Sequence, residues 1–500
     1  MTFLVNYVHV ILLCIQLCPL LAEKNRPNII VLLADDLGRE SLPSYGNNEE
    51  KVPNVERLFM EGAKFNHLLS PAALCTPSRS AFLTGRYPYR FGLGEGSNGP
   101  PVIVYSSSKV GLPRNESTWA NLAQSLGYST KAVGKWHMGM DEIFWGDQEH
   151  GPLTHGFDSF YGLPFTVVPG FEGQQEFWTL QRSNSQILIT VIILLLLGWW
   201  RSLWMERYLN SILVSNEKVV ERPIQLKRLA ERLTNESLKF IHQNVGVKPF
   251  LLYHAFHNLH KPVQVSDEFV GKGSGTPYSD SLVEMDYQIG RILDTLDDLS
   301  IQNNTIVFFA SDHGKLGQNL PFKGGKGAPS LEGGVRIPGA IRWPNRIPSG
   351  FAINEPISLL DFFPTLNQIL DTDYTLKKLD GKSFYESVSN HSSSIPRMLY
   401  HFCGIQIHAL RYYDGRGSII KGVFAKENLN SDGICSEGIC NCAKAALIPS
   451  EQMDILNVTS DGKEEKLSSH AENEYRSLFL KTYNDFKKEK KTFSTTGFIF

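Results

Sequence analysis

NIIVLLADD, residues 28–36, is a continuous run of apolar residues, several of them β-branched, that ends in two aspartates. A strand that is buried on both faces has this form, because none of its side chains points to water. Pro249–Tyr253 and Thr305–Ala310 have the same form, and each is followed by polar residues that include histidine. Such strands are typical of the parallel or mixed sheets of α/β proteins.

Helical patterns lie between these strands, at residues 53–62, 117–126, 226–243 and 280–299. Strands that alternate with helices indicate a layered α/β fold. We therefore predict a large mixed β-sheet sandwiched by helices. Open sheets of this kind bind ligands beyond the carboxyl ends of their strands, which is where the polar residues of this chain stand.

The 500 residues are 42% hydrophobic and 20% charged, as in ordinary globular proteins. The formal net charge of −2 gives no reason to expect nucleic acid as a partner. From about residue 375 the segments become shorter and more polar, and four cysteines follow between positions 403 and 442. We predict a large α/β domain over residues 23–375 and a smaller α+β subdomain over residues 376–500. The four cysteines predict disulfides in this subdomain, and their spacing allows three pairings.

The first 22 residues form an apolar run that ends before the first charged residue. This pattern predicts a signal peptide over residues 1–22, although basic residues at its start are missing, and the alternative is an N-terminal anchor. Five N-x-S/T triplets agree with a route through the secretory pathway, to the endoplasmic reticulum lumen or membrane, to a lysosome or to the exterior. They predict glycosylation at Asn115, Asn235, Asn303, Asn390 and Asn457.

The most hydrophobic stretch of the chain is an insert at residues 187–204. Its apolar part, ILITVIILLLLGWW, has 14 residues, fewer than the roughly 20 that a straight membrane span needs. Residues that we expect to share one site lie on both sides of the insert, and a single crossing would separate them. We therefore expect membrane contact as a hairpin, a re-entrant segment or a helix in the interface, with a buried core helix or strand as the alternative.

Asp35, Asp36, Asp312 and His313 directly follow two of the predicted strands. Taken singly, such residues are common in turns. Together, three carboxylates and a histidine at strand ends predict a site for a hard cation, Ca²⁺ or Mg²⁺, because zinc prefers more nitrogen or sulfur ligands. Around this site we expect a cationic set suited to a tetrahedral oxyanion, made of Arg79, Lys135, His137, His260 and Lys326.

Cys75 has no cysteine near it in the sequence, although secreted proteins usually pair their cysteines. Its surroundings, Cys-Thr-Pro-Ser-Arg at 75–79, resemble the C-x-P-x-R signature of the type I sulfatases. GKWHMG at 134–139 is similar to the second signature of that family. The resemblance runs from NIIVLLADDLG to MDILNVTSDGKEE and is nearest to the arylsulfatase and steryl-sulfatase branch.

The resemblance implies an alkaline-phosphatase-like sulfatase fold and a modified nucleophile. In this family a formylglycine-generating enzyme oxidises the signature cysteine, here Cys75, to Cα-formylglycine, whose hydrate carries two hydroxyls on one carbon. One hydroxyl, activated by the cation, attacks sulfur and displaces the alcohol, and the other then restores the aldehyde and expels sulfate. A serine would stay trapped as a stable sulfate ester.

The resemblance also implies one Ca²⁺ per chain, bound by Asp35, Asp36, Asp312, His313 and the residue at position 75. Many relatives carry Asn or Gln where this chain has His313. Arg79 would hold the formylglycine, and Lys135 would contact both the formylglycine and the sulfate.

Three further residues take roles by the same resemblance. His137 would deprotonate the spare hydroxyl, while His260 and Lys326 would bind sulfate oxygens and assist the leaving oxygen. His260 is preferred to His254 and His257 because it occupies the H-x-P position of the family motif. The implied disulfides are Cys403–Cys442 and Cys435–Cys440.

We therefore predict a Ca²⁺-dependent sulfatase that releases inorganic sulfate and an alcohol from a small sulfate ester, with aryl or steroid sulfates expected first. The alternatives are a glycosaminoglycan or sugar sulfatase and an inactive sulfatase-like binding protein. A phosphatase of the same superfold would carry a Thr or Ser nucleophile and more histidine ligands. The chain departs from the steryl branch because it has one short apolar stretch instead of two long helices, and fewer cysteines in its N-terminal part.

Overall fold

The computed structural model describes residues 26–47, 49–94, 102, 111–140, 149–166, 211–372, 374, 378–389, 395–435, 439–459 and 461–494. The predicted leader at 1–22, the apolar insert at 187–204 and the triplet at Asn390 lie outside these residues. Within the described part of the chain, no helix combines the length and the apolar character needed to cross a bilayer.

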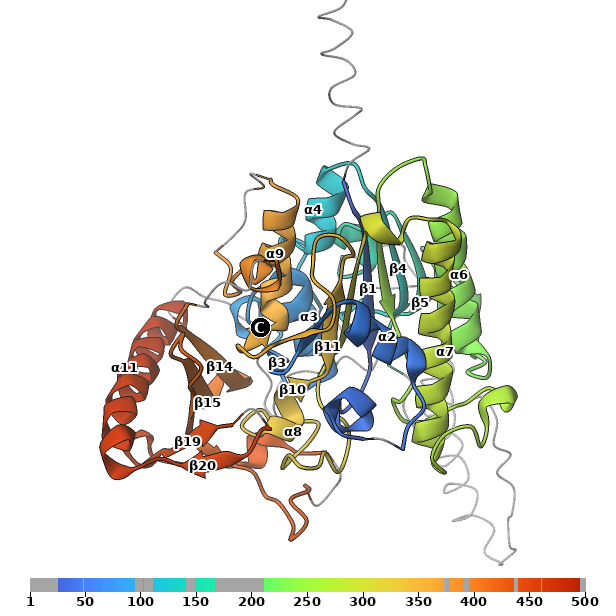
Figure 1. Cartoon of the computed structure of the whole chain (residues 1–500). Helices are drawn as coiled ribbons and strands as arrows, with labels where there is room; N and C mark the ends of the chain where they lie inside the picture. The colour runs from blue at the N-terminus through green and yellow to red at the C-terminus, as the bar shows by residue number, and fades with distance from the viewer. Residues whose placement is uncertain are drawn as a thin grey trace, which may run out of the picture.

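A ten-stranded mixed sheet forms the centre of the large domain (Figure 1). Its strands lie in the order β12-β2-β11-β9-β1-β8-β4-β5-β6-β7. The five strands from β9 to β5 run parallel, and β11, β6 and β7 pair antiparallel with their neighbours. The strands are β1 Asn28–Ala34, β2 Ala63–Phe65, β4 Ser129–Lys135, β5 Ser159–Leu163, β6 Leu213–Ser215, β7 Lys218–Glu221, β8 Phe250–Ala255, β9 Thr305–Ser311, β11 Gly339–Arg342 and β12 Phe351–Ile353. The predicted mixed sheet is confirmed.

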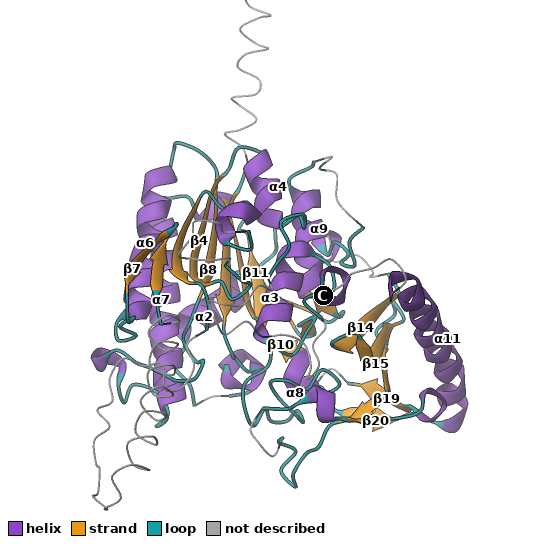
Figure 2. Ribbon diagram, turned by 180° about the vertical axis from the view of Figure 1, so that it is seen from behind, coloured by secondary structure: helices purple, strands orange, loops and turns teal. Residues whose placement is uncertain are grey.

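The sequence of strand β1 is continuously apolar because both of its faces are buried. Ile29, Val31 and Leu33 pack in the core on one face of the sheet, whereas Ile30 and Leu32 pack in the core on the other. Helices cover both faces, with α3, α4 and α9 on the first and α2, α6 and α7 on the second (Figure 2). Their bounds are α2 Pro53–Glu61, α3 Cys75–Thr84, α4 Trp119–Ser125, α6 Leu229–Asn244, α7 Pro277–Asp298, α9 Phe362–Ile369 and α10 Tyr385–Ser389.

A second sheet, antiparallel and five-stranded, follows in the order β14-β15-β16-β19-β20. Its strands and the helix that covers it are β14 Arg397–Cys403, β15 Gln406–Tyr413, β16 Ile419–Val423, β19 Asp454–Val458, β20 Glu464–Lys466 and α11 Ser469–Ser494. Phe479, Tyr483 and Phe486 of α11 pack on this sheet, in a cluster that also contains Ala81 of α3. The C-terminal subdomain therefore shares a core with the main domain. It contains the disulfides Cys403–Cys442 and Cys435–Cys440.

Two smaller sheets, β10-β3-β13 and β17-β18, complete the strands, and α8 lies between the two larger sheets in Figure 1. These elements are β3 Leu68–Leu69, α8 Glu332–Val335, β10 Arg336–Ile337, β13 Ile357–Ser358, β17 Ala425–Lys426 and β18 Ala446–Leu447. Glu332 of α8 is buried and forms ion pairs with Arg411 of β15 and with Lys421 of β16, at 2.9 Å in the second case. The two domains are thus joined by a buried ionic contact as well as by apolar packing.

Candidate active site

The carboxyl ends of neighbouring strands meet at one edge of the ten-stranded sheet. Asp35 and Asp36 follow β1, Asp312 follows the adjacent β9, and Lys135 is the last residue of β4. Strand β8 lies between β1 and β4, and the chain that leaves it leads to His260. The topology therefore brings together residues that are distant in the sequence, as expected for this class of sheet.

Cys75 is the first residue of α3, all of whose residues are buried. Arg79 lies one helical turn later, so the two side chains project from the same side of the helix. The Arg79 guanidinium donates from Nε to Oδ2 of Asp312 at 3.0 Å, and from a terminal nitrogen to the carbonyl of Lys135 at 3.1 Å. The start of α3 is thereby fixed against the strand ends.

Three buried carboxylates and an imidazole surround the thiol. Sγ of Cys75 lies 3.0 Å from Nε2 of His313 and 3.8 Å from Oδ1 of Asp35. The main-chain N–H of Asp36 donates to Oδ1 of Asp312 at 3.3 Å. Two overlapping sets of potential ligand atoms each lie within 4.8 Å of one another, namely Asp35, Cys75, Asp312 and His313, and Asp35, Asp36, Cys75 and His260.

Two lysines approach these carboxylates from opposite parts of the chain. Nζ of Lys135 lies 2.5 Å from Oδ2 of Asp35, and Nζ of Lys326 lies 2.7 and 3.0 Å from the two carboxylate oxygens of Asp36. Both ammonium groups are buried. An anion that entered the site would therefore meet two desolvated cations.

The carboxylates influence one another strongly. Burial alone would raise the pKa of Asp35, but Lys135, with His260 and Arg79, holds it below its ordinary value. Burial raises the pKa of Asp312 to about 6, and the neighbouring Asp35 adds to the rise. Carboxylates this close repel one another, and a bound cation would relieve the repulsion.

The donor set fits Ca²⁺ on two grounds. It is rich in carboxylate oxygen, the ligand that this ion prefers. Ca²⁺ lies 2.3–2.6 Å from its ligands, so ligands on opposite sides of it stand roughly 5 Å apart. All the ligand atoms of each set lie within 4.8 Å of one another, so one such ion could contact them together.

The environment of Cys75 favours the thiolate. Burial acts against the charged form, but Lys135, Lys326 and His313 together bring the pKa of the Cys75 thiol well below its ordinary value. The start of a helix acts in the same direction. Among the described cysteines, Cys75 alone forms no disulfide.

His137 lies beside the thiol in an uncommon backbone conformation, with φ of 61°. Burial, and then the charge of Lys135, lowers the pKa of His137 to about 3, so its ring is neutral near pH 7 and able to accept a proton. Gly134, three residues earlier, has φ of +93°, and a β-carbon there would lie 1.9 Å from the carbonyl oxygen of Ala255. Glycine is therefore required for β4 to approach β8 at the site.

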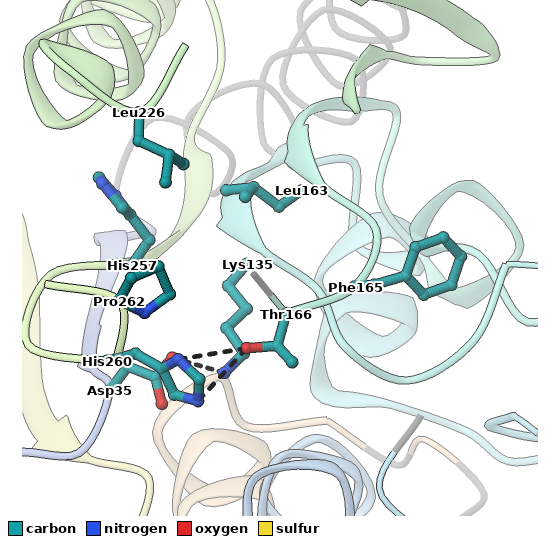
Figure 3. Close-up of a pocket in the computed structure, with 9 residues that line it drawn as sticks. All are labelled: Asp35, Lys135, Leu163, Phe165, Thr166, Leu226, His257, His260 and Pro262. Atoms are coloured by element: carbon teal, nitrogen blue, oxygen red, sulfur yellow. Dashed lines mark hydrogen bonds and ion pairs between the residues drawn. The ribbon is translucent and has the colours of Figure 1, made fainter. Parts of the chain in front are cut away.

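A pocket opens beside the cluster (Figure 3). Asp35, Lys135 and His260 form its polar end together with Thr166, whose Oγ1 lies 3.4 Å from Nε2 of His260. The remaining lining residues are Leu163, Phe165, Leu226, Pro262 and His257. Burial lowers the pKa of His257 to about 4, so this imidazole is neutral near pH 7. Leu163 and Leu226 lie at the end of the pocket away from His260 (Figure 3).

The structure brings all the predicted site residues into this cluster or onto this pocket, namely Asp35, Asp36, Cys75, Arg79, Lys135, His137, His260, Asp312, His313 and Lys326. The three histidines at the end of β8 and in the loop after it separate in space. His254 lies within the strand, with Nδ1 at 2.7 Å from the hydroxyl of Ser237, whereas His257 and His260 both line the pocket.

Several residues that support the site are not among those predicted from the sequence. The hydroxyls of Ser70 and Ser78 donate to the main-chain carbonyl of Asp312 at 2.7 and 2.5 Å, which fixes the backbone that carries this carboxylate. Ser78 stands inside the C-x-P-x-R motif, so its position was a usable signal. Thr166 carries no comparable signal, because its role depends on which loops meet at the pocket. His257, to which His260 is preferred on the sequence motif, also lines the pocket.

Comparison with known proteins agrees with this geometry. A family model described as Sulfatase matches residues 27–372. Arylsulfatase H of Canis lupus familiaris is 34% identical over 475 residues, which cover 85% of this chain and 84% of the relative. Steryl-sulfatase of Homo sapiens is 34% identical over 502 residues, covering 88% and 84%. The crystal structure of the PsFucS1 sulfatase from Pseudoalteromonas sp. is similar with a TM-score of 0.75 at 25% identity, covering 93% of this chain and 91% of that one.

Proposed function

The chain belongs to the sulfatase family and hydrolyses sulfate esters, and on that premise we propose that its substrates are aryl or steroid sulfates, cleaved by a formylglycine made from Cys75 beside a bound Ca²⁺. The observation that carries the proposal is the surroundings of Cys75. Its thiol lies among three carboxylates, while Lys135, Lys326 and two histidines stand within the same buried cluster.

The residues that would hold the cation are Asp35, Asp36, Asp312 and His313, together with the residue at position 75. When bound, Ca²⁺ would neutralise the carboxylates and favour the ionised form of an oxygen nucleophile. With the carboxylates engaged by the ion, Lys135 and Lys326 would be able to bind the anionic substrate. Their present partners, Asp35 and Asp36, are the carboxylates that the ion would occupy.

Formylglycine at position 75 would supply two hydroxyls on one carbon, one as the nucleophile and the other as the group that lets sulfate leave. His137 would take the proton of the second hydroxyl, because its ring is neutral and lies beside residue 75. Arg79 would hold residue 75 in position. The two side chains project from the same face of α3, and the Arg79 guanidinium is fixed by its ion pair with Asp312.

The alcohol part of the substrate would lie in the pocket of Figure 3. His260 stands at the polar end, where it would donate a proton to the leaving oxygen. Leu163, Leu226 and Pro262 offer apolar surface to the rest of the leaving group. An apolar wall suits a ring system of an aryl or steroid alcohol better than a sugar, whose hydroxyls would need hydrogen-bond partners.

The experiment is a comparison of kcat/KM over a panel of sulfate esters, with the chain produced alongside a formylglycine-generating enzyme and supplied with Ca²⁺. We expect hydrolysis of p-nitrophenyl sulfate and of a steroid sulfate, and weaker hydrolysis of monosaccharide sulfates. Leu226→Ser serves as the specificity variant, and its effect should be larger for the aryl ester than for a sugar sulfate. Preference for sugar sulfates by the unmodified pocket would overturn the substrate assignment and leave the sulfatase assignment intact.

We also propose that the protein matures in the secretory pathway. Two disulfides support this, since they persist in oxidising compartments. Asn115, Asn235 and Asn303 are exposed and Asn457 is half-buried, so the first three are accessible for glycosylation. A mass shift on treatment with an N-glycosidase tests the glycosylation. Release from membranes by carbonate would contradict integral membrane contact through residues 187–204.

A further inference from the structure

The main chain of Lys326 is bonded to the C-terminal subdomain. Its carbonyl accepts a hydrogen bond from the N–H of Cys440 at 2.8 Å. Cys440 forms a disulfide with Cys435, five positions earlier, and both cysteines pack against Ala328. We propose that the Cys435–Cys440 disulfide is a positioning element that holds Lys326 in place for sulfate binding. This inference rests on the proposed function, in which the Lys326 ammonium binds the sulfate group. In the structure this ammonium donates a hydrogen bond to Asp36.

Contacts on both sides of Lys326 support this role. The N–H of Gly324 donates to the carbonyl of Gly433 at 2.9 Å. Gly327 has φ of +89°, and a β-carbon there would lie 1.8 Å from the carbonyl oxygen of Cys440. Because no larger side chain fits this gap, glycine allows the two main chains to touch. The segment that carries Lys326 is therefore fixed before the lysine to Gly433, two positions ahead of the disulfide, and after the lysine to Cys440 itself.

The same segment also contacts the chain that leads to the nucleophile. The N–H of Gly327 donates to the carbonyl of Ala73 at 2.8 Å, and Ala73 precedes Cys75 by two positions. Lys326 thus lies between the segment of Cys75 on one side and Cys440 on the other. A displacement of Cys440 would move the main chain of Lys326, and with it the origin of the side chain that reaches the active site.

The size of the disulfide ring agrees with a local role. Cys435–Cys440 spans five positions, whereas Cys403–Cys442 spans 39. A short ring removes less conformational entropy from the unfolded chain than a long one, so it contributes less to global stability. Among the described residues, Cys403 and Cys442 form no hydrogen bond with residues 323–328. The longer disulfide is therefore a matched control within the same subdomain.

The test is a double-mutant cycle on the full-length protein. Cys435→Ser/Cys440→Ser and Cys403→Ser/Cys442→Ser are each made in the wild-type and in the Lys326→Ala background. Formylglycine content is measured by mass spectrometry in every variant, and kcat/KM for p-nitrophenyl sulfate is expressed per modified molecule. Residues that act through one another show non-additive effects, whereas independent structural losses add.

We expect loss of the short disulfide to lower kcat/KM by about tenfold in the wild-type background and by less than about threefold in the Lys326→Ala background. The control pair should lower kcat/KM by less than about threefold in both backgrounds, even where it lowers the melting temperature more. Equal effects of the short disulfide in the two backgrounds would overturn the inference. So would equal effects of the two disulfides.

If the short-disulfide variant does not fold, Gly327→Ala provides the test. The added β-carbon displaces the contact between Gly327 and the Cys440 carbonyl and leaves both disulfides in place. Its readout is competitive inhibition by inorganic sulfate, which measures sulfate binding directly. We expect the inhibition constant to rise in Gly327→Ala and to differ little between Lys326→Ala and the Gly327→Ala/Lys326→Ala double variant. An unchanged inhibition constant in Gly327→Ala would contradict the inference. A wild-type protein that is fully modified and hydrolyses no sulfate ester would instead contradict the proposed function.

Discussion

Nε2 of His313 lies 3.0 Å from Sγ of Cys75, although 238 positions separate the two residues in the chain. His313 follows β9 and Cys75 begins α3, so the contact joins the edge of the sheet to the helix that presents the nucleophile. Burial alone would lower the pKa of His313, but Asp312 and the Cys75 thiolate raise it to about 9. Nδ1 of His313 lies 2.9 Å from the carbonyl oxygen of Gly314, so Nε2 is the nitrogen that faces residue 75. To bind the cation, this imidazole would have to give up its proton.

His313→Asn and His313→Leu should separate ligation from packing. Asn retains an oxygen donor of similar reach, so we expect Ca²⁺ affinity close to that of the wild type. Leu has no donor, and we expect an affinity loss of at least about tenfold, the scale seen when groups around a metal site are removed. Calcium titration followed by melting temperature measures this, since a ligand stabilises the protein that binds it. Equal affinities for the Leu variant and the wild type would exclude His313 as a ligand.

Cys75→Ser should abolish turnover. Serine offers one hydroxyl, so it would accept sulfate once and retain it, and we expect kcat to fall on the order of 10⁴-fold or more. The measurement is steady-state hydrolysis of p-nitrophenyl sulfate, with the intact mass of the protein recorded afterwards. Ser80→Ala is the control, because Ser80 lies on the same helix and its hydroxyl donates only to the helix carbonyl of Pro77, at 3.0 Å. Sustained turnover by Cys75→Ser would contradict the two-hydroxyl mechanism.

Glu332→Gln should destabilise the junction between the two domains. Burial would raise the pKa of Glu332, but Arg411, Lys421 and Arg336 bring it well below its ordinary value. Removing the carboxylate charge leaves the buried Arg411 without its carboxylate partner, whereas Lys421 keeps Glu464 at 2.7 Å, and we expect a loss of about 3–5 kcal/mol in the free energy of unfolding. Denaturant unfolding at pH 7 measures it. Asp461→Asn, in an exposed pair with Lys463, is the control and should leave the free energy of unfolding nearly unchanged.

The buried His401 should make the protein less stable in mild acid. Burial, and then Arg411, lowers the pKa of His401 well below its ordinary value, so the ring is neutral in the folded protein. The unfolded chain takes up this proton below about pH 6.5, so the stabilisation from His401 is complete above that pH and is lost as the pH falls. His401→Gln should therefore reduce the slope of unfolding free energy against pH, between pH 6.5 and 5, by up to about 1.4 kcal/mol per unit.

The control for this slope is His470→Gln, because His470 is exposed. We expect its slope between pH 6.5 and 5 to match that of the wild type. A His401→Gln slope equal to that of the wild type would contradict a neutral, buried His401.

The central strands could be predicted from the sequence because both of their faces are buried. β1, β8 and β9 begin and end within two residues of the predicted runs. Short edge strands such as β6 and β7 carry no such signal, since three or four residues with mixed exposure do not establish a period.

Two predicted helix starts differ from the structure because the residue before the helix decides where it begins. α7 begins at Pro277, three residues before the predicted start, and the hydroxyl of Thr276 caps it by accepting from the N–H of Ser279. Thr followed by Pro is a recognised start signal. α6 begins at Leu229, three residues after the predicted start, because Arg228 adopts a left-handed conformation.

The main residues of the site could be predicted because they stand at strand ends or inside recognisable motifs. The contacts that hold them could not. Ser70 acts through a main-chain carbonyl, and Cys440 acts on Lys326 across 114 positions, so neither contact leaves a periodic or local pattern in the sequence. These supporting contacts become visible only when the loops are placed in space.

The most direct test of the account is the mass of the tryptic peptide Phe65–Arg79 from protein matured in a secretory pathway. Conversion of Cys75 to formylglycine replaces the thiol with an aldehyde, so the modified peptide is lighter than the cysteine form and reacts with carbonyl reagents. We predict that the lighter, carbonyl-reactive peptide predominates in active preparations and that its fraction is proportional to sulfatase activity. A fully active preparation in which this peptide contains only a free or blocked thiol would contradict the account.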